Sequence, residues 1–229
     1  MKYLRLVVEG STEEAFVNEV LAPYFSPKLI ISCRRIQTGW DPAQNKPAKG
    51  GLLKFGKFHR DLNRCIEADR DKSECWYSSF IDLYAFPVDS ESPYIKEIRD
   101  ILDLDKKIIR LEEQIFKKIN HPRFIPYVQL HEFEAFIFIE LERLNEVFPG
   151  SDSAIRALDK GKKGKAPEEI NDSEHTAPSK RIIKVIPAYE GLKATVGPMI
   201  AHDLGMQKLR DHCPHFDSWI KKLENLANG

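Results

Sequence analysis

The sequence predicts an α/β fold built on a parallel sheet, and the order of its apolar segments is the main reason. Apolar runs of strand length at residues 4–8, 29–36, 76–86 and 124–130 alternate with amphipathic segments that have helical periodicity. Strands that alternate with helices in this way form parallel sheets through right-handed crossover connections. The sequence therefore predicts a βαβαβαβ core.

The helices of this core are predicted from caps and apolar stripes. Ser11 and Glu14 have capping-box spacing directly after the first apolar run. A second stripe spans residues 55–66. Ser92-Pro93 favours a helix start, and we expect one long helix from there toward Asn120. Its inward residues are expected to be Ile95, Ile98, Ile101, Leu102, Ile108 and Ile109.

The chain changes character after Leu141, where glycine, proline and lysine interrupt shorter helical stretches. We predict that residues 1–141 form the α/β core and that residues 142–229 form a helical C-terminal extension. The last helical stretch, 215–226, is amphipathic, and we expect the extension to pack on the sheet. The two parts are expected to make one structural domain.

Composition excludes some classes of protein. The 35 basic and 35 acidic side chains balance, so net charge does not favour nucleic acid or membrane binding. No apolar run approaches the roughly 20 residues that span a bilayer. The N-terminal residues lack a signal-peptide pattern, and the four cysteines are scattered as in reduced proteins. We expect a cytoplasmic protein without a membrane partner.

Acidic residues follow the predicted strands. Glu9 ends the first, Asp82 lies in the third, and Glu132 and Glu134 follow the fourth. Ligands of open parallel sheets bind beyond the carboxyl ends of the strands, so these groups should meet at one edge. Carboxylates gathered there suit Mg²⁺ or Mn²⁺, which can polarise a phosphate and generate a hydroxide nucleophile. Glu13, on the next helix, is a further candidate metal ligand.

Simpler roles stay open for each of these residues. An acid after a strand often caps the next helix or favours its N-terminus electrostatically. His131, a further candidate, is more commonly a structural histidine. An aspartate inside an apolar strand, such as Asp82, needs a partner in either case.

A basic pair opens a predicted helix in the C-terminal extension. Ser179 is expected to cap this helix, and Lys180 and Arg181 follow it. Free N–H groups beside two cations would suit a phosphate. The alternative is that Arg181 pairs with a carboxylate and that Lys180 is solvated.

The stretch from Val7 to Glu13, Val-Val-Glu-Gly-Ser-Thr-Glu, resembles the opening motif of Toprim domains, particularly those of overcoming-lysogenization-defect (OLD) nucleases. Nearly the whole chain is similar to a bacterial family named domain of unknown function 4276. The features shared with that family are Gly50-Gly51, Asp82-Leu83-Tyr84, His131-Glu132-Phe133-Glu134, Ala177-Pro178-Ser179-Lys180-Arg181 and Cys213-Pro214-His215-Phe216.

The Toprim resemblance implies a Mg²⁺ site for phosphodiester chemistry. Glu9 matches the Toprim glutamate and Asp82 the first residue of its Asp-x-Asp pair. Tyr84 stands at the second aspartate. Either Glu132, Glu134 or Asp89 replaces that acid, or the metal site is altered or lost.

The leading hypothesis is a Mg²⁺- or Mn²⁺-dependent nuclease acting on DNA or RNA, with Glu9, Asp82, Glu132, Glu134 and Lys180 as catalytic residues. The resemblance implies a role in bacterial anti-phage defence beside a separate ABC- or SMC-like ATPase, since this chain has no phosphate-cradling loop of its own. A non-catalytic Toprim-like subunit that binds an ATPase or nucleic acid is the second hypothesis, and a small-molecule phosphohydrolase is the third. The oligomeric state stays open.

Overall fold

The computed structural model describes residues 1–41, 46–49, 52, 54–84, 86–170 and 177–229. Gly50-Gly51 therefore lies outside the described residues. In chain order the elements are β1 (Lys2–Val8), α1 (Ser11–Phe16), the π-helical turn η1 (Val17–Leu21), α2 (Ala22–Phe25), β2 (Leu29–Arg35), β3 (Gln37–Asp41), β4 (Lys46–Lys49), α3 (Phe55–Ala68), β5 (Cys75–Asp82), α4 (Lys96–Arg99), α5 (Leu104–Ile119), β6 (Phe124–Ile125), β7 (Val128–Gln129), the 3₁₀ helix η2 (Phe133–Ile139), α6 (Arg143–Val147), α7 (Asp152–Lys162), the 3₁₀ helix η3 (Pro167–Glu169), α8 (Pro178–Val185), the 3₁₀ helix η4 (Pro187–Leu192), α9 (Lys193–His212) and α10 (Pro214–Asn228).

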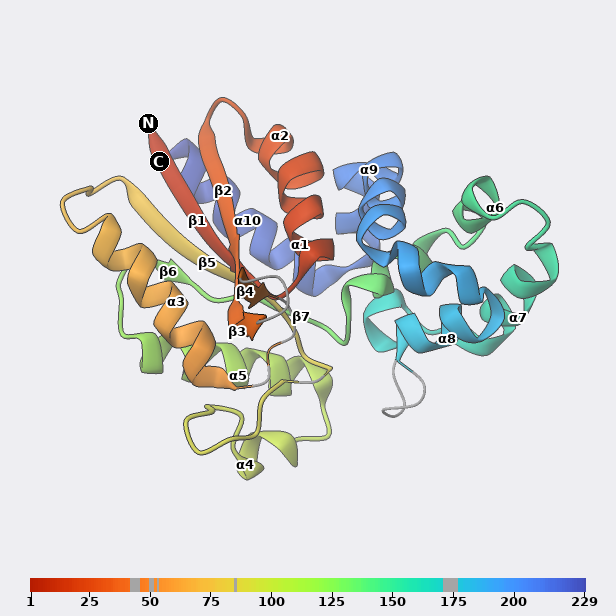
Figure 1. Cartoon of the computed structure of the whole chain (residues 1–229), viewed down its shortest axis with the longest axis horizontal. Coiled ribbons are helices and arrows are strands. Elements are labelled where there is room, and N and C mark those ends of the chain that lie inside the picture. The colour runs from red at the N-terminus through yellow and green to blue at the C-terminus, as the bar shows by residue number, and fades with distance from the viewer. Residues whose placement is uncertain (42–45, 50–51, 53, 85, 171–176) are drawn as a thin grey trace.

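The predicted parallel sheet is confirmed. Its strands lie in the order β2-β1-β5-β6, with β7 also paired to β5, and every pair is parallel. Helices α3 and α5 cover one face, while α1 and α10 cover the other and α9 packs against α1 (Figure 1). The alternation of buried residues along β1 explains the two layers, because Leu4, Leu6 and Val8 pack on one side and Val7 packs on the other.

The fourth predicted strand is broken into β6 and β7. Pro126 lies between them and has no N–H to donate to the ladder. The hydroxyl of Ser79 closes the gap, since it donates to the carbonyl of Tyr127 and accepts from the Tyr127 N–H, both at 2.9 Å. The third strand is also shorter than predicted: β5 ends at Asp82, whereas the apolar run extends to residue 86.

The predicted long helix from residue 92 to 120 is wrong. The structure has a short α4 and a separate α5, whose start is capped by the Asp103 side chain accepting from the Lys106 N–H at 3.0 Å. The break changes the helical phase, so Ile95, Leu102 and Ile109 are exposed although the single stripe placed them inward.

The N-terminal cap of α1 also differs from the prediction. The helix begins after Gly10, and the Glu13 carboxylate accepts from the Gly10 N–H at 2.6 Å. Glu14, the residue predicted for this role, forms an ion pair with Arg35 at 2.9 Å instead. The N-cap is therefore Gly10, one residue before the predicted Ser11. Because of this shift, Glu13 faces inward in place of Glu14.

The C-terminal residues pack on the sheet through α10. Trp219 donates its indole N–H to the hydroxyl of Ser78 on β5 at 3.1 Å and stacks on Tyr127 with ring centroids 4.3 Å apart. The two chain ends lie side by side (Figure 1), and Lys2 donates to the carbonyl of Leu226 at 3.1 Å. The division at residue 141 stays a prediction.

The structure describes the cysteines and the apolar character of the helices. All four cysteines are free thiols. Within the described ranges, no helix combines the length and the apolar character that crossing a bilayer requires.

The start of α10 supplies a test of how the extension is held. Glu168 is buried, and its carboxylate accepts from the N–H groups of His215 and Phe216 at 3.0 and 3.1 Å. Glu168→Ala should lower the free energy of unfolding by about 1–3 kcal/mol, because both N–H groups would lose their acceptor. Urea unfolding measures this, with the exposed Glu19→Ala as control. Equal midpoints for the two variants would show that the cap is dispensable.

Candidate active site at the carboxyl edge of the sheet

Glu9 and Asp82 lie together, as the strand order requires. β1 and β5 are parallel neighbours, with Val8 opposite Phe80, so the two acids leave the sheet at the same edge. The Asp82 N–H donates to Oε2 of Glu9 at 3.2 Å. Oε1 of Glu9 accepts from the Leu52 N–H, also at 3.2 Å. Burial raises the pKa of Glu9, although these two N–H groups favour its charged form.

Asp82 carries the most unusual carboxylate of this edge. Its Oδ2 accepts a long hydrogen bond of 3.4 Å from the Phe133 N–H. Its Oδ1 is buried and has no hydrogen-bond partner among the described residues. Burial raises the pKa of Asp82 well above its ordinary value, and repulsion from four glutamates raises it further; they are Glu13, Glu9, Glu132 and Glu134. We call these five residues the acidic cluster.

Glu13 enters the acidic cluster from the first turn of α1. Its side chain is buried beneath Gly10, whose N–H it accepts. Burial raises the pKa of Glu13 to about 8, with further contributions from the charges of Glu9 and Glu134. Glu13 therefore has two roles: it caps the start of α1, and it adds negative charge to the acidic cluster.

Glu132 and Glu134 reach the cluster from the start of η2. Glu132 is buried, and its carboxylate accepts from both the N–H and the hydroxyl of Ser179, at 2.8 and 3.1 Å. The Oε1 of Glu134 accepts from the Tyr189 hydroxyl at 3.4 Å and lies 3.5 Å from the Lys193 ammonium. Burial raises the pKa of Glu134, and Lys193 opposes that shift.

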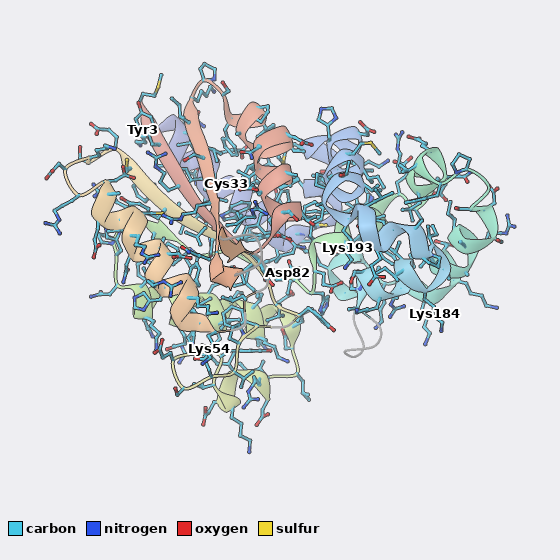
Figure 2. All side chains as sticks on the ribbon, in the orientation of Figure 1. Tyr3, Cys33, Lys54, Asp82, Lys184 and Lys193 are labelled. Carbon is cyan, nitrogen blue, oxygen red and sulfur yellow. The ribbon has the colours of Figure 1, made fainter. Side chains whose placement is uncertain are left out.

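Lys193 is a site residue that sequence reasoning missed. Among the described residues, its ammonium is the one cation within 4 Å of an acidic-cluster carboxylate. Its side chain is about one-third exposed, and Figure 2 labels it at the start of α9. Lys193 is the first residue of α9, four residues after the buried Tyr189. Neither residue belongs to a recognisable motif, so only the fold could indicate them.

His131 and Tyr84 lie where the strands end. His131 is buried and has a φ of 63°, in the left-handed region, and its carbonyl accepts from the Tyr84 N–H at 2.8 Å. This hydrogen bond extends the pairing of β5 with β7, in which the Leu83 N–H donates to the Gln129 carbonyl at 2.9 Å. The backbone of His131 therefore has a clear structural role.

The predicted phosphate-binding residues have other partners. Ser179 is the second residue of α8, so its prediction as N-cap is wrong, and its donors bind Glu132. The carboxyl group of Glu132 thus occupies the helix N-terminus that a phosphate would need. Arg181 donates to the carbonyl of Gly161 at 2.9 Å, and Lys180 is exposed.

Asp89 does not join the acidic cluster. Its carboxylate accepts from the N–H groups of Phe55 and Glu91, both at 2.9 Å, and so caps the start of α3. Of the three acids that could replace the residue at Tyr84, Glu132 and Glu134 raise the pKa of Asp82, whereas Asp89 is bound at the start of α3.

The donor set can be tested for its fit to a divalent ion. Among the described residues, no three acid, histidine or cysteine side chains are grouped closely enough to hold a metal by themselves. Mg²⁺, however, keeps several waters and often binds through one or two carboxylates. The buried, unpartnered Oδ1 of Asp82 beside Glu9 fits that mode, since a cation would satisfy the oxygen and neutralise its neighbours.

The fold and this edge define an α/β protein with a buried acidic cluster beyond a parallel sheet. The family described as domain of unknown function (DUF4276) matches residues 8–224, and the chain belongs to that family. The predicted family membership is therefore confirmed. No curated protein and no solved structure matches the chain.

The acidic cluster predicts an unusual pH dependence of stability. Glu13 has a folded pKa of about 8, above its ordinary 4.5, so the folded state binds more protons between these values. The free energy of unfolding should then fall as pH rises, by up to about 1.4 kcal/mol per pH unit. Glu13→Gln should flatten this decline in metal-free protein. Urea unfolding at pH 5, 6.5 and 8 measures it, and an unchanged slope would contradict the assignment.

Proposed function

We propose that this protein is a Mg²⁺- or Mn²⁺-dependent nuclease that hydrolyses phosphodiester bonds of DNA or RNA. The observation that carries the proposal is the buried Oδ1 of Asp82. This oxygen has no described hydrogen-bond donor, and the charges of four glutamates repel it. An unpaired buried carboxylate costs free energy that a bound cation would recover. The unpaired carboxylate lies at the carboxyl edge of a parallel sheet, which is where such sheets bind their ligands.

The residues have distinct roles in the proposed reaction. Asp82 and Glu9 would hold the ion, which polarises a phosphate and lowers the pKa of its bound water. Glu134, whose pKa is raised by burial, is suited to accept a proton from the attacking water. The Lys193 side chain is partly exposed and lies 3.5 Å from Glu134, so it is suited to contact the phosphate. Glu132 keeps the start of α8 against the site.

The Toprim-like assignment of the core belongs to the same proposal. Its support is the parallel β1–β5 pair with Glu9 after one strand and Asp82 at the end of the other. Tyr84 stands where Toprim domains have their second aspartate. Glu132 and Glu134, whose charges act on Asp82, are the residues that would replace that aspartate.

Partner and biological role follow from the resemblance. We propose that the nuclease is the effector of a cytoplasmic anti-phage system and works with an ABC- or SMC-like ATPase encoded separately. The sequence has no phosphate-cradling loop, so ATP hydrolysis would have to come from such a partner. A gene for an ATPase beside the gene for this chain is what this part of the proposal requires.

A second candidate is a non-catalytic scaffold with the same fold. The observation in its favour is Tyr84, because a phenol is a poor Mg²⁺ ligand and no described trio of side chains forms a ready-made metal site. The two candidates differ in whether the acidic cluster binds a divalent ion and whether that ion supports cleavage.

Metal binding can be measured without any substrate. Mg²⁺ or Mn²⁺ at pH 8 should raise the melting temperature of the wild-type protein, because it neutralises the acidic cluster only in the folded state. Asp82→Asn should abolish this increase while raising the melting temperature of the metal-free protein. Glu19→Gln, on an exposed helix face, is the matched control. A wild-type protein that does not respond to either ion would favour the scaffold.

Cleavage tests the roles of single residues. Glu9→Gln and Asp82→Asn should each reduce Mn²⁺-dependent cleavage of plasmid, single-stranded DNA or tRNA by ~100-fold or more. Lys193→Met should reduce it comparably, whereas Lys184→Met on the exposed side of α8 should not (Figure 2). Lys180→Met tests the lysine that the sequence indicated. Product that persists in EDTA or in Asp82→Asn would refute the nuclease assignment.

A further inference from the structure

An arginine-lined groove lies away from the acidic cluster. It is a cavity of about 320 Å³ between β1, β2 and the second half of α3. Its charged and hydroxyl-bearing lining consists of Arg5, Ser32, Arg34, Arg64 and Asp69. The strand register places Arg5 directly beside Ser32, so these two side chains rise from the same face of the sheet. We call this cavity the arginine groove.

The arginine side chains are held in place from below. Arg5 donates from Nε to Asp69 at 3.1 Å and from Nη1 to the hydroxyl of Ser32 at 2.7 Å. Arg64 donates to Asp61 at 3.2 Å. Both aspartates are buried, whereas both guanidinium groups remain partly exposed. This arrangement fixes the cations before a ligand arrives and reduces the entropy that binding costs.

Positive charge exceeds negative charge around the groove. Asp69 also contacts Lys72 at 2.7 Å, and Asp61 also contacts Arg60 at 3.5 Å, so two carboxylates are shared by four cations. Arg34 is exposed, and its guanidinium contacts the side chain of Cys65, which lines the same cavity; among the described residues it forms no ion pair with a carboxylate. The chain as a whole has no net charge, so this excess is a local property of one surface.

The lining selects a phosphate ligand. Guanidinium groups bind phosphate oxygens in a bidentate fashion, and the remaining lining residues are small or aliphatic; they are Leu6, Cys33, Cys65 and Ala68. None of the described lining residues is aromatic, so they offer no surface on which a base could stack. Contacts of this kind hold a nucleic-acid backbone in position without reading its sequence.

The edge strand β2 leads from the groove toward the acidic cluster. Arg34 lies on β2 opposite Val7, two residues nearer the carboxyl edge of the sheet than Ser32. Val7 itself is buried under α3, which covers the direct line along β1, whereas Arg34 is exposed. A backbone held by Arg34 is therefore directed along the outer side of β2 toward the edge where Asp82 lies.

We propose that the arginine groove binds the phosphate backbone of the nucleic-acid substrate and directs it toward the acidic cluster. This inference rests on the proposed nuclease function for the identity of its ligand. The geometry and charge of the groove are independent of the acidic cluster, so the two can fail separately.

Binding is best measured in the Asp82→Asn background, where cleavage is removed. Fluorescence anisotropy with labelled single-stranded DNA, duplex DNA and RNA gives the Kd at several salt concentrations. Arg34→Ala should weaken binding roughly tenfold and reduce the salt slope by about one, because it removes one phosphate contact. Arg34→Lys should retain part of the affinity, since it keeps the positive charge and loses the bidentate geometry of the guanidinium group. Arg156→Ala on the exposed face of α7 is the matched control.

Each outcome decides the proposal. Unchanged binding in Arg34→Ala and in the double variant with Arg64→Ala would overturn it, as would equal weakening by Arg156→Ala. Inorganic phosphate or a mononucleotide that binds as tightly as an oligonucleotide would assign the groove to a small ligand and overturn the backbone assignment. No nucleic-acid binding at all would also overturn it. Arginine-dependent binding by a wild-type protein that cleaves nothing would support the groove and refute only the nuclease.

Discussion

The parallel pairing of β1 with β5 is the constraint on which the site depends. It makes Glu9 and Asp82 emerge at one edge, where the backbone N–H of Asp82 donates to the Glu9 carboxylate. Two acids so placed repel each other, and Glu13, Glu132 and Glu134 add to that repulsion. The strand register thus concentrates acidic side chains at this edge, and the surrounding residues must stabilise them.

The acidic cluster is stabilised mainly by neutral donors. The N–H groups of Leu52, Gly10 and Phe133 each donate to a different acid, while Lys193 is the one cation within 4 Å among the described residues. Neutral donors reduce the free-energy cost of burying a carboxylate without cancelling its charge. The remaining cost of burial and repulsion raises the pKa values of Glu9, Glu13 and Asp82.

Another buried acid of the same chain shows the contrast. Burial alone would raise the pKa of Asp69, but Lys72 and Arg5 outweigh it and hold that pKa below its ordinary value. The fold thus pairs a buried carboxylate with two cations where the role is structural. At the sheet edge it leaves an oxygen of Asp82 without a described partner, which is the arrangement expected of a site that binds an external cation.

Periodicity and strand ends were enough to predict the sheet and the meeting of Glu9 with Asp82, because both follow from local sequence and the rule of parallel crossovers. What sequence missed depends on tertiary contacts. The Ser179 donors suit a phosphate by sequence alone, yet Glu132 reaches them from 47 residues away. The break of the fourth strand had a visible signal in Pro126, and the helix break before α5 had one in Asp103. Lys193 had none, since a lysine at a helix start is ordinary until Glu134 lies beside it.

These contacts also change how the C-terminal residues should be regarded. Glu132 and Glu134 come from the segment before residue 141, but Ser179, Tyr189 and Lys193, which bind them, come from the segment after it. The same segment covers one face of the sheet through Trp219. Removing it would expose that face and leave two buried acids without donors, so the α/β core without its helices could not keep the acidic cluster in this geometry. The helices after residue 141 are thus part of the site itself, and the proposed chemistry requires both segments in one chain.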